Sequence, residues 1–168
     1  KSVLDVEIYI VDPSNDSLKI CRDRILEVNP TYNISKINNL SSVEELPLSL
    51  DLLIVATTAN IRWKVISDFF KFGRKVKYAI LEKVLFQREV EYSQCESLLR
   101  ENNVRAWVNC PRRLIPIYTK LRAVVAGKLN AGVVSGGSWG LASKSIHFID
   151  IILSLTACGK SIVSVLEP

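Results

Sequence analysis

The 168-residue sequence contains no methionine, one histidine and seven glycines, of which Gly73 is the first. The G-x-G-x-x-G loop that joins the first strand and helix of many nucleotide-binding folds is therefore absent from the N-terminal part of the chain. The chain also begins at Lys1 rather than at a methionine. From these absences we expect a piece of a longer protein.

Cysteine is sparse, and its spacing excludes two kinds of site. Cys21, Cys95, Cys110 and Cys158 lie too far apart for a zinc knuckle or a CxxC redox pair. Separated cysteines without a secretory leader predict reduced thiols and a cytoplasmic protein. The longest apolar stretches, such as residues 149–155, are too short to span a bilayer, so no membrane association is expected.

The charge balance is mildly basic, with a formal net charge of +5 and 48% hydrophobic residues. Lysine and arginine are scattered rather than gathered into a stripe with aromatic residues, which argues against nucleic acid as a partner. An anionic small ligand would suit the same excess of positive charge. We find no metal-ligand cluster, no Ser–His–Asp arrangement and no Walker loop in the sequence.

Short apolar runs alternate with segments of helical periodicity along residues 1–116. We expect strands at 6–11, 33–37, 51–56, 76–81 and 104–108, and helices from about 15, at 60–72 and at 89–101. This alternation predicts βαβ units and an α/β fold with a Rossmann-like, doubly wound parallel sheet. The near-continuous apolar run 51–56 predicts a strand buried on both faces.

The pattern changes after Pro116. A helix through residues 121–127 leads to the stretch "AGVVSGGSWG", and a second helix then carries the single histidine. Gly159 is expected to end that helix, and "SIVSVLE" predicts a further strand. We therefore place a second domain, part of an α+β unit, at residues 117–168.

Polar or small residues stand where the expected strands end, and ligands of parallel α/β sheets bind beyond the carboxyl ends of the strands. Asp12 has the position of the acid that binds the ribose hydroxyls of NAD, with the missing first strand and glycine loop expected before Lys1. An Asp-Pro turn explains Asp12 equally well. The other strand ends carry the following residues: Ala56, Thr57, Thr58, Glu82 and Lys83.

A second glycine-rich motif offers an alternative nucleotide site. Residues 135–140, "SGGSWG", match G-x-G-x-x-G except at the first position, and Glu167 would then be the ribose acid. The bulk of Trp139 argues against close approach of the backbone to a pyrophosphate, so this is the weaker interpretation.

Four stretches in order, "DLLIVATTAN", "YAILEKVLF", "VRAWVNCPRRLIP" and "GGSWGLASKSIHFIDIILSLTACG", resemble the glucose–fructose oxidoreductase and inositol dehydrogenase family. The resemblance implies a Rossmann domain followed by a domain built on a large, mostly antiparallel sheet, with this chain shortened at both ends. It also implies a nicotinamide cofactor, NAD with NADP as the alternative, and a homo-oligomer when intact. The amino-acid sequence of the last stretch most resembles that of family members associated with bacterial surface-polysaccharide pathways.

Two family motifs carry the implied chemistry. Glu82-Lys83-Val84 resembles the EKP motif, whose lysine faces substrate and nicotinamide, with Val84 in place of the proline. That proline follows a cis peptide bond in the family, so here either the bond before Val84 is cis or Lys83 points differently. His147 matches the catalytic histidine, while Ser143 replaces the partner aspartate one helical turn earlier.

"ATTAN" resembles the ATP-x-x-x-H loop beneath the nicotinamide ribose, with Thr58 for proline and Arg62 for histidine. Arg113 and Pro116 match an arginine and a proline that follow the next strand. Asp150 is expected to pair or cap rather than to catalyse. The resemblance implies these cofactor-binding residues and no metal: Asp12, Ala56, Thr57, Thr58, Asn60, Glu82 and Arg113.

These residues predict an oxidoreductase that transfers a hydride between the cofactor and a hydroxyl of a sugar, cyclitol or sugar derivative. Lys83 would polarise the hydroxyl and His147 would exchange its proton. A histidine between Ile146 and Phe148 is, on spacing alone, more often a core residue, and Glu82-Lys83 more often a solvated strand end. The alternative function is a non-catalytic dinucleotide- or sugar-binding sensor or scaffold.

Overall fold

The structure is a computed structural model and describes residues 5–28, 33–128, 133–137 and 140–156. The strand expected in "SIVSVLE" and its preceding Gly159 lie outside the described residues. So does Glu167, and the alternative glycine-rich motif at 135–140 is only partly described.

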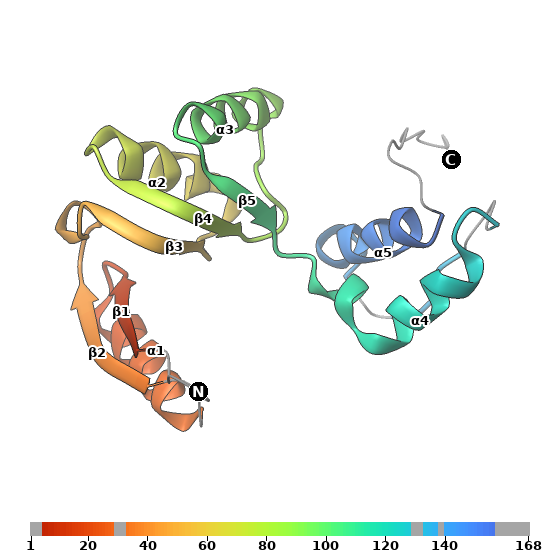
Figure 1. Cartoon of the computed structure of the whole chain (residues 1–168), viewed down its shortest axis with the longest axis horizontal. Helices are drawn as coiled ribbons and strands as arrows, with labels where there is room; N and C mark the ends of the chain where they lie inside the picture. Colours follow the sequence, from red (N-terminus) through yellow and green to blue (C-terminus); the bar gives the residue numbers. More distant parts are fainter. Residues whose placement is uncertain (1–4, 29–32, 129–132, 138–139, 157–168) are drawn as a thin grey trace.

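The described strands and helices follow the predicted order (Figure 1). Their bounds differ from the expected ones by up to three residues, except that the helix expected through residues 121–127 begins five residues earlier, at Pro116. The 3-10 turn η1 (Val43–Glu45) precedes β3, and η2 (Pro111–Leu114) follows β5. The other elements are β1 (Asp5–Val11), α1 (Asn15–Glu27), β2 (Asn33–Leu40), β3 (Ser49–Val55), α2 (Ala59–Lys71), β4 (Lys75–Leu81), α3 (Glu89–Glu101), β5 (Arg105–Val108), α4 (Pro116–Val125) and α5 (Leu141–Thr156).

The described strands form two parallel sheets, β1-β2 and β3-β4-β5, rather than the single sheet that was predicted. In the strand order 3-2-1-4-5-6 of the doubly wound fold, β2 and β1 take positions 3 and 2, and β3 to β5 take positions 4 to 6. No described strand takes position 1, so β1 and β3 do not pair with each other. The fold class, parallel α/β, is as predicted.

Register brings the carboxyl ends of three strands level. Val55 pairs with Leu81, and Leu81 pairs with Val108, so β3, β4 and β5 end in one row. The residues that follow these strands therefore lie along a single edge of the sheet. This edge holds most of the residues that the sequence singled out.

Helices α2 and α3 cover one face of the β3-β4-β5 sheet (Figure 1). Ala79 in the central strand, Ile66 and Phe69 in α2, and Cys95 in α3 are each at most 2% exposed. Burial raises the pKa of the Cys95 thiol to about 11. A protonated, enclosed thiol is inert, so Cys95 is a core residue.

The opposite face of the same sheet carries large exposed side chains. Leu52, Ile54 and Trp107 are 46%, 61% and 55% exposed, and the Tyr78 and Trp107 rings lie 6.1 Å apart. The prediction that residues 51–56 are buried on both faces is therefore wrong for this face. No helix of the described ranges packs there, whereas α2 and α3 bury the alternate residues, such as Val55.

Beyond the end of β5 the chain continues through η2 into α4 and α5, which lie against each other (Figure 1). Pro116 opens α4, where its missing amide proton is not needed. The domain boundary expected at residues 116 and 117 falls at the start of α4 and stays a prediction. None of the helices in the described ranges is long and apolar enough to cross a membrane.

Candidate functional site at the carboxyl ends of the strands

The tip of β4 carries the Glu82-Lys83 pair at the shared edge. Both side chains are half-buried, and the backbone of Glu82 still donates to the carbonyl of Val55 at 3.0 Å. The peptide bond between Lys83 and Val84 is cis, which is one of the two alternatives raised by the sequence. The pair is therefore not a fully solvated strand end.

Asn109 fixes the carboxylate of Glu82. Its Nδ2 donates to Glu82 Oε1, while Glu82 Oε2 accepts from the backbone N–H of Lys83 at 3.3 Å. Asn109 is itself held by a 2.7 Å hydrogen bond from its backbone N–H to the carbonyl of Leu81. Sequence reasoning missed Asn109, although its position directly after β5, in register with the end of β4, was a usable signal.

Arg62, which stands at the family's histidine position, joins two of the loops at this edge. Its Nη1 donates to the carbonyls of Val84 at 2.5 Å and Leu85 at 2.6 Å, and its Nη2 donates to the carbonyl of Thr57. The residue is 2% exposed, and this burial lowers the pKa of its guanidinium. Arg62 thus holds the backbone that follows Lys83 against the loop that follows β3.

The loop after β3 contains the small and polar residues expected beside a cofactor. Ala56 directly follows the strand. Thr58 is the N-cap residue of α2, and its hydroxyl donates to Asn60 Oδ1 at 2.5 Å and accepts no capping hydrogen bond from the helix backbone. The Thr57 Oγ1 is buried and has no hydrogen-bond partner among the described residues. Because buried hydroxyls are nearly always hydrogen-bonded, this atom fits a polar group of a bound molecule.

Asp12 lies at the end of β1. One carboxylate oxygen accepts the backbone N–H of Ser14 at 2.8 Å, and the Asp12 N–H donates to the carbonyl of Leu40 at 3.1 Å. Ser14 in turn caps α1. The Asp-Pro turn that the sequence offered as an alternative is therefore present, and ribose binding by Asp12 stays a prediction.

His147 lies on α5, and the charges at the tip of β4 act on its imidazole. Burial lowers the pKa of its imidazole, and the positive charges of Arg112 and Lys83 lower it further, against the opposing effects of Glu82 and Asp150. Its Nδ1 is buried without a hydrogen-bond partner among the described residues. A histidine from the second expected domain and a lysine from the first therefore share one electrostatic environment.

The turn η2 attaches α5 to this edge. Arg113 donates through Nε, at 2.8 Å, and through Nη2 to the two carboxylate oxygens of Asp150, and this contact raises the pKa of the guanidinium. The neighbouring Arg112 lies over the ring of Phe148, with Cζ 5.0 Å from its centroid. Asp150 thus pairs, as the sequence predicted, and a cofactor contact by Arg113 stays a prediction.

Cys110, which follows β5, is affected by charges from the same elements. The pKa of its thiol is raised by burial and then by the charge of Asp150, and the charges of Arg113, Glu82 and Lys83 also act on it. The thiol thus lies within electrostatic reach of the acid–lysine pair that follows β4 and of the Arg113–Asp150 ion pair. No functional role was predicted for Cys110 from the sequence.

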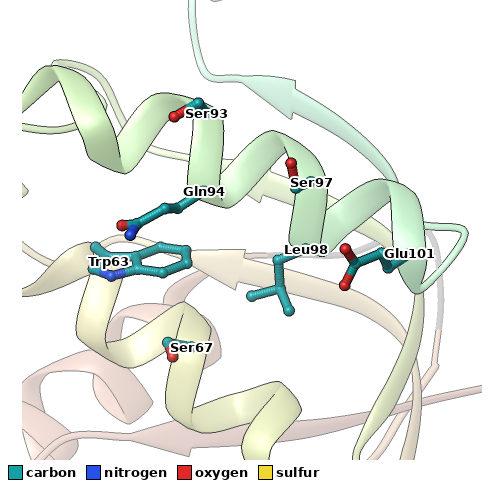
Figure 2. A pocket seen from close by; sticks show the side chains of 7 residues that line it. All are labelled: Trp63, Ser67, Ser93, Gln94, Ser97, Leu98 and Glu101. Atoms are coloured by element: carbon teal, nitrogen blue, oxygen red, sulfur yellow. The ribbon is translucent and has the colours of Figure 1, made fainter.

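A shallow groove also lies between the outer sides of α2 and α3 (Figure 2). It contains none of the predicted site residues, and its lining is Trp63, Ser67, Ser93, Gln94, Ser97, Leu98 and Glu101. The candidate site lies instead at the strand ends, where Thr57 Oγ1, Arg62 Nε and His147 Nδ1 are buried without a hydrogen-bond partner among the described residues. Within the described ranges, no three His, Cys, Asp or Glu residues are grouped to hold a metal ion.

No protein-family model matches the sequence, and no curated protein matches it. Solved structures do. A dehydrogenase (MviM) from Clostridium difficile matches at a TM-score of 0.59 and 15% identity, over 90% of this chain and 57% of that one. A probable dehydrogenase from Thermotoga maritima matches at 0.62 and 15%, over 89% and 47%.

The transcriptional regulator Gal80p from Kluyveromyces lactis matches at a TM-score of 0.66 and 14% identity, over 88% of this chain and 43% of that one. The chain thus spans about half the length of these solved proteins. Enzymes and a regulator share the architecture, so the likeness establishes the fold and not the activity. The chain therefore has the fold of the glucose–fructose oxidoreductase and inositol dehydrogenase family, whose motifs its sequence resembles.

Proposed function

We propose that the chain is the site-bearing part of an NAD(P)-dependent oxidoreductase acting on a hydroxyl of a sugar, cyclitol or sugar derivative. One observation carries the proposal: the charge of Lys83, at the tip of β4, acts on the imidazole of His147 on α5 and helps to lower its pKa. A cation that can polarise a hydroxyl and a base that can accept its proton are the two groups this oxidation requires.

The proposed cofactor site lies along the ends of β1 and β3. Thr57 offers its unpartnered hydroxyl, and the small Ala56 leaves the edge open to a planar ring. Asp12 keeps its second carboxylate oxygen for ribose hydroxyls, which favours NAD over NADP, although Lys19 and Arg22 supply nearby positive charge in the sequence. When bound, the nicotinamide supplies the hydride acceptor.

The proposed proton path uses only residues of this chain. The lowered pKa keeps the His147 imidazole neutral near pH 7, which is the form that accepts a proton from the substrate hydroxyl. The Lys83 ammonium donates a hydrogen bond to the same oxygen and stabilises the charge that develops on it. Arg62 and Asn109 hold the backbone and the acid on either side of Lys83, so the amine is presented from a fixed loop.

The proposal is tested with the protein as its host makes it, by following NADH absorbance over a panel of sugars, cyclitols and sugar acids. We expect substrate-dependent reduction of NAD for at least one class, with NADP tested in parallel. Saturable cofactor binding without turnover of any panel member would contradict the enzymatic proposal. The same preparation tests the expected homo-oligomer by its mass in solution, and the expected cytoplasmic location by fractionation.

A non-catalytic role is the second candidate, and two observations favour it. Ser143 stands where the family has its partner aspartate, and Gal80p, a transcriptional regulator by its description, has a similar structure. In this role the same edge would bind dinucleotide or sugar and report its presence to a partner. Tight cofactor binding that neither Lys83→Met nor His147→Gln alters, with no turnover, would support it.

A further inference from the structure

The groove between α2 and α3 lies outside the strand-end site and has a lining of its own (Figure 2). Its volume is about 440 Å³. Pockets for small ligands commonly have volumes of about 300–1,000 Å³, so the groove can take a molecule of the size of one sugar ring. Because the groove is shallow, part of any ligand would stay in water.

Helical spacing explains why these side chains share one groove. Gln94, Leu98 and Glu101 are separated by four and then three residues on α3, and Trp63 and Ser67 by four residues on α2. Residues at these spacings lie on one face of a helix. Figure 2 shows Gln94 and Leu98 reaching from α3 toward α2, which carries Trp63 and Ser67. The two helices thus bring an indole and several polar groups to one place.

The indole of Trp63 is held from its buried side. It packs against the edge of the core, and its ring meets that of Phe86 at a right angle, with the centroids 6.4 Å apart. Phe86 is 3% exposed and also meets the ring of Tyr92, at 5.2 Å. Trp63 itself is only half-buried, and it lines the groove. A fixed aromatic face, which carries partial negative charge, suits the C–H hydrogens of a sugar ring.

The polar side chains of the groove suit hydroxyl groups and disfavour anions. Gln94 offers an amide that donates and accepts, Ser67 a hydroxyl, and Glu101 a carboxylate that accepts. No lysine or arginine is among the described residues that line the groove. Glu101 forms no salt bridge within the described part of the chain, so its charge would repel a carboxylate or a phosphate.

We infer that this groove is a ligand site separate from the strand ends, and that it binds the ring of a neutral sugar or cyclitol. The C–H side of the ring packs on the Trp63 indole, and its hydroxyls bond to Gln94, Ser67 and Glu101. A partner helix would need a continuous apolar stripe, whereas Trp63 and Leu98 are the only large apolar residues of this lining. The inference does not depend on the proposed function, because the groove and the strand-end site share no residue.

The test follows indole N–H signals by NMR in the full protein labelled with nitrogen-15, without cofactor. Glucose, myo-inositol and sodium glucuronate are titrated in turn, and the Trp63 signal is the one that Trp63→Leu removes. We expect a saturable shift of this signal with a neutral ligand at a Kd of about 1–10 mM, since a shallow groove buries little of it. Glucuronate should bind about threefold more weakly or less, because Glu101 repels it.

Two variants address the groove, and the Gln94 side-chain amide or the Trp63 indole reports on each. Trp63→Leu should weaken binding about tenfold or more, because it removes the stacking surface. Gln94→Ala removes one hydrogen-bonding group from an exposed helix position, so the fold is kept and binding should weaken about three- to tenfold. Trp107→Leu is the matched control, since Trp107 is 55% exposed on the sheet face away from α2 and α3, and it should leave the Kd unchanged. A urea unfolding midpoint checks that each variant is folded.

Three results would overturn the inference. They are no saturable shift with either neutral ligand, glucuronate binding as tight as that of glucose, and equal affinity in Trp63→Leu and Trp107→Leu. Binding at the strand ends is separable, because it should shift the His147 signal and respond to Lys83→Met, whereas binding in the groove should do neither. Turnover of a sugar without a shift at Trp63 would keep the oxidoreductase and remove this inference. Groove binding in a protein that turns nothing over would keep the inference and remove the enzyme.

Discussion

Replacing Lys83 by methionine is expected to lower kcat for the hydroxyl substrate by about 100- to 10,000-fold, with a much smaller change in KM. Methionine keeps most of the volume of the side chain and removes the ammonium that would polarise the hydroxyl. The loss falls mainly on kcat because the charge on the oxygen develops only in the transition state. Steady-state kinetics of NADH formation measure both constants.

Lys77→Met is the matched control, since Lys77 lies on the same strand, is exposed and pairs with Asp51. It should leave kcat within about twofold of the original, as expected for an exposed pair distant from the site. His147→Gln should cost about as much as Lys83→Met, and the double variant little more, because the two groups act on one proton transfer. Full activity in Lys83→Met would exclude the proposed role.

The same pair predicts the pH dependence. Oxidation needs the neutral imidazole, so activity should fall as pH drops through the pKa of His147, which lies below its usual value. Among variants with measurable residual activity, Lys83→Met should move this acid limb to higher pH, because it removes a positive charge that lowers the pKa.

Replacing Arg62 by methionine is expected to lower the free energy of unfolding by about 3 kcal/mol. The variant leaves the carbonyls of Thr57, Val84 and Leu85 without their charged donor, and each buried acceptor without a partner costs about 1–3 kcal/mol. The cost of burying the guanidinium, visible in its lowered pKa, offsets part of the loss. Urea unfolding followed by circular dichroism measures the change.

Arg100→Met serves as the control for Arg62. Arg100 lies on α3 and pairs with Glu96, with three quarters of its side chain exposed, so its removal should cost less than about 0.5 kcal/mol. Unchanged stability in Arg62→Met would mean that water or backbone movement satisfies the three carbonyls. The hydrogen bonds by which Arg62 joins the loops after β3 and β4 would then contribute nothing to the free energy of unfolding.

Periodicity was sufficient to predict the alternating elements. The runs before Asp12, Ala56 and Glu82 are short, apolar and rich in β-branched residues, and each ends at a polar or small residue. A polar or small residue after an apolar run locates the end of a strand well, because the backbone leaves the buried sheet there. The parallel arrangement followed from helices long enough to serve as crossovers.

Pairing and coverage of the sheets could not be read from the same pattern. A continuous apolar run such as 51–56 does not reveal whether a second layer lies over Leu52 and Ile54, because that depends on segments far away in the sequence. Similarly, nothing local in β1 and β3 shows that they belong to separate sheets, and the only sequence signal was the expected absence of the first strand that would lie between them.

The supporting residues of the site were harder to predict than Lys83 and His147. Arg62 donates its hydrogen bonds to backbone carbonyls. Because every residue has a backbone carbonyl, no sequence motif identifies these partners. Asn109 is recognised only from the register of β5 against β4. Arg113 pairs with Asp150 on α5 rather than with Glu82. This choice depends on the position of η2 relative to α5, which the sequence does not reveal.

The amine of Lys83 on a strand tip and the imidazole of His147 on a later helix serve one site, and titration of His147 by NMR tests this without substrate or cofactor. Its pKa should lie below the ordinary value of about 6.5 and should rise in Lys83→Gln, but not in Lys77→Gln. An ordinary pKa that stays the same in Lys83→Gln would place the two groups apart and contradict the account.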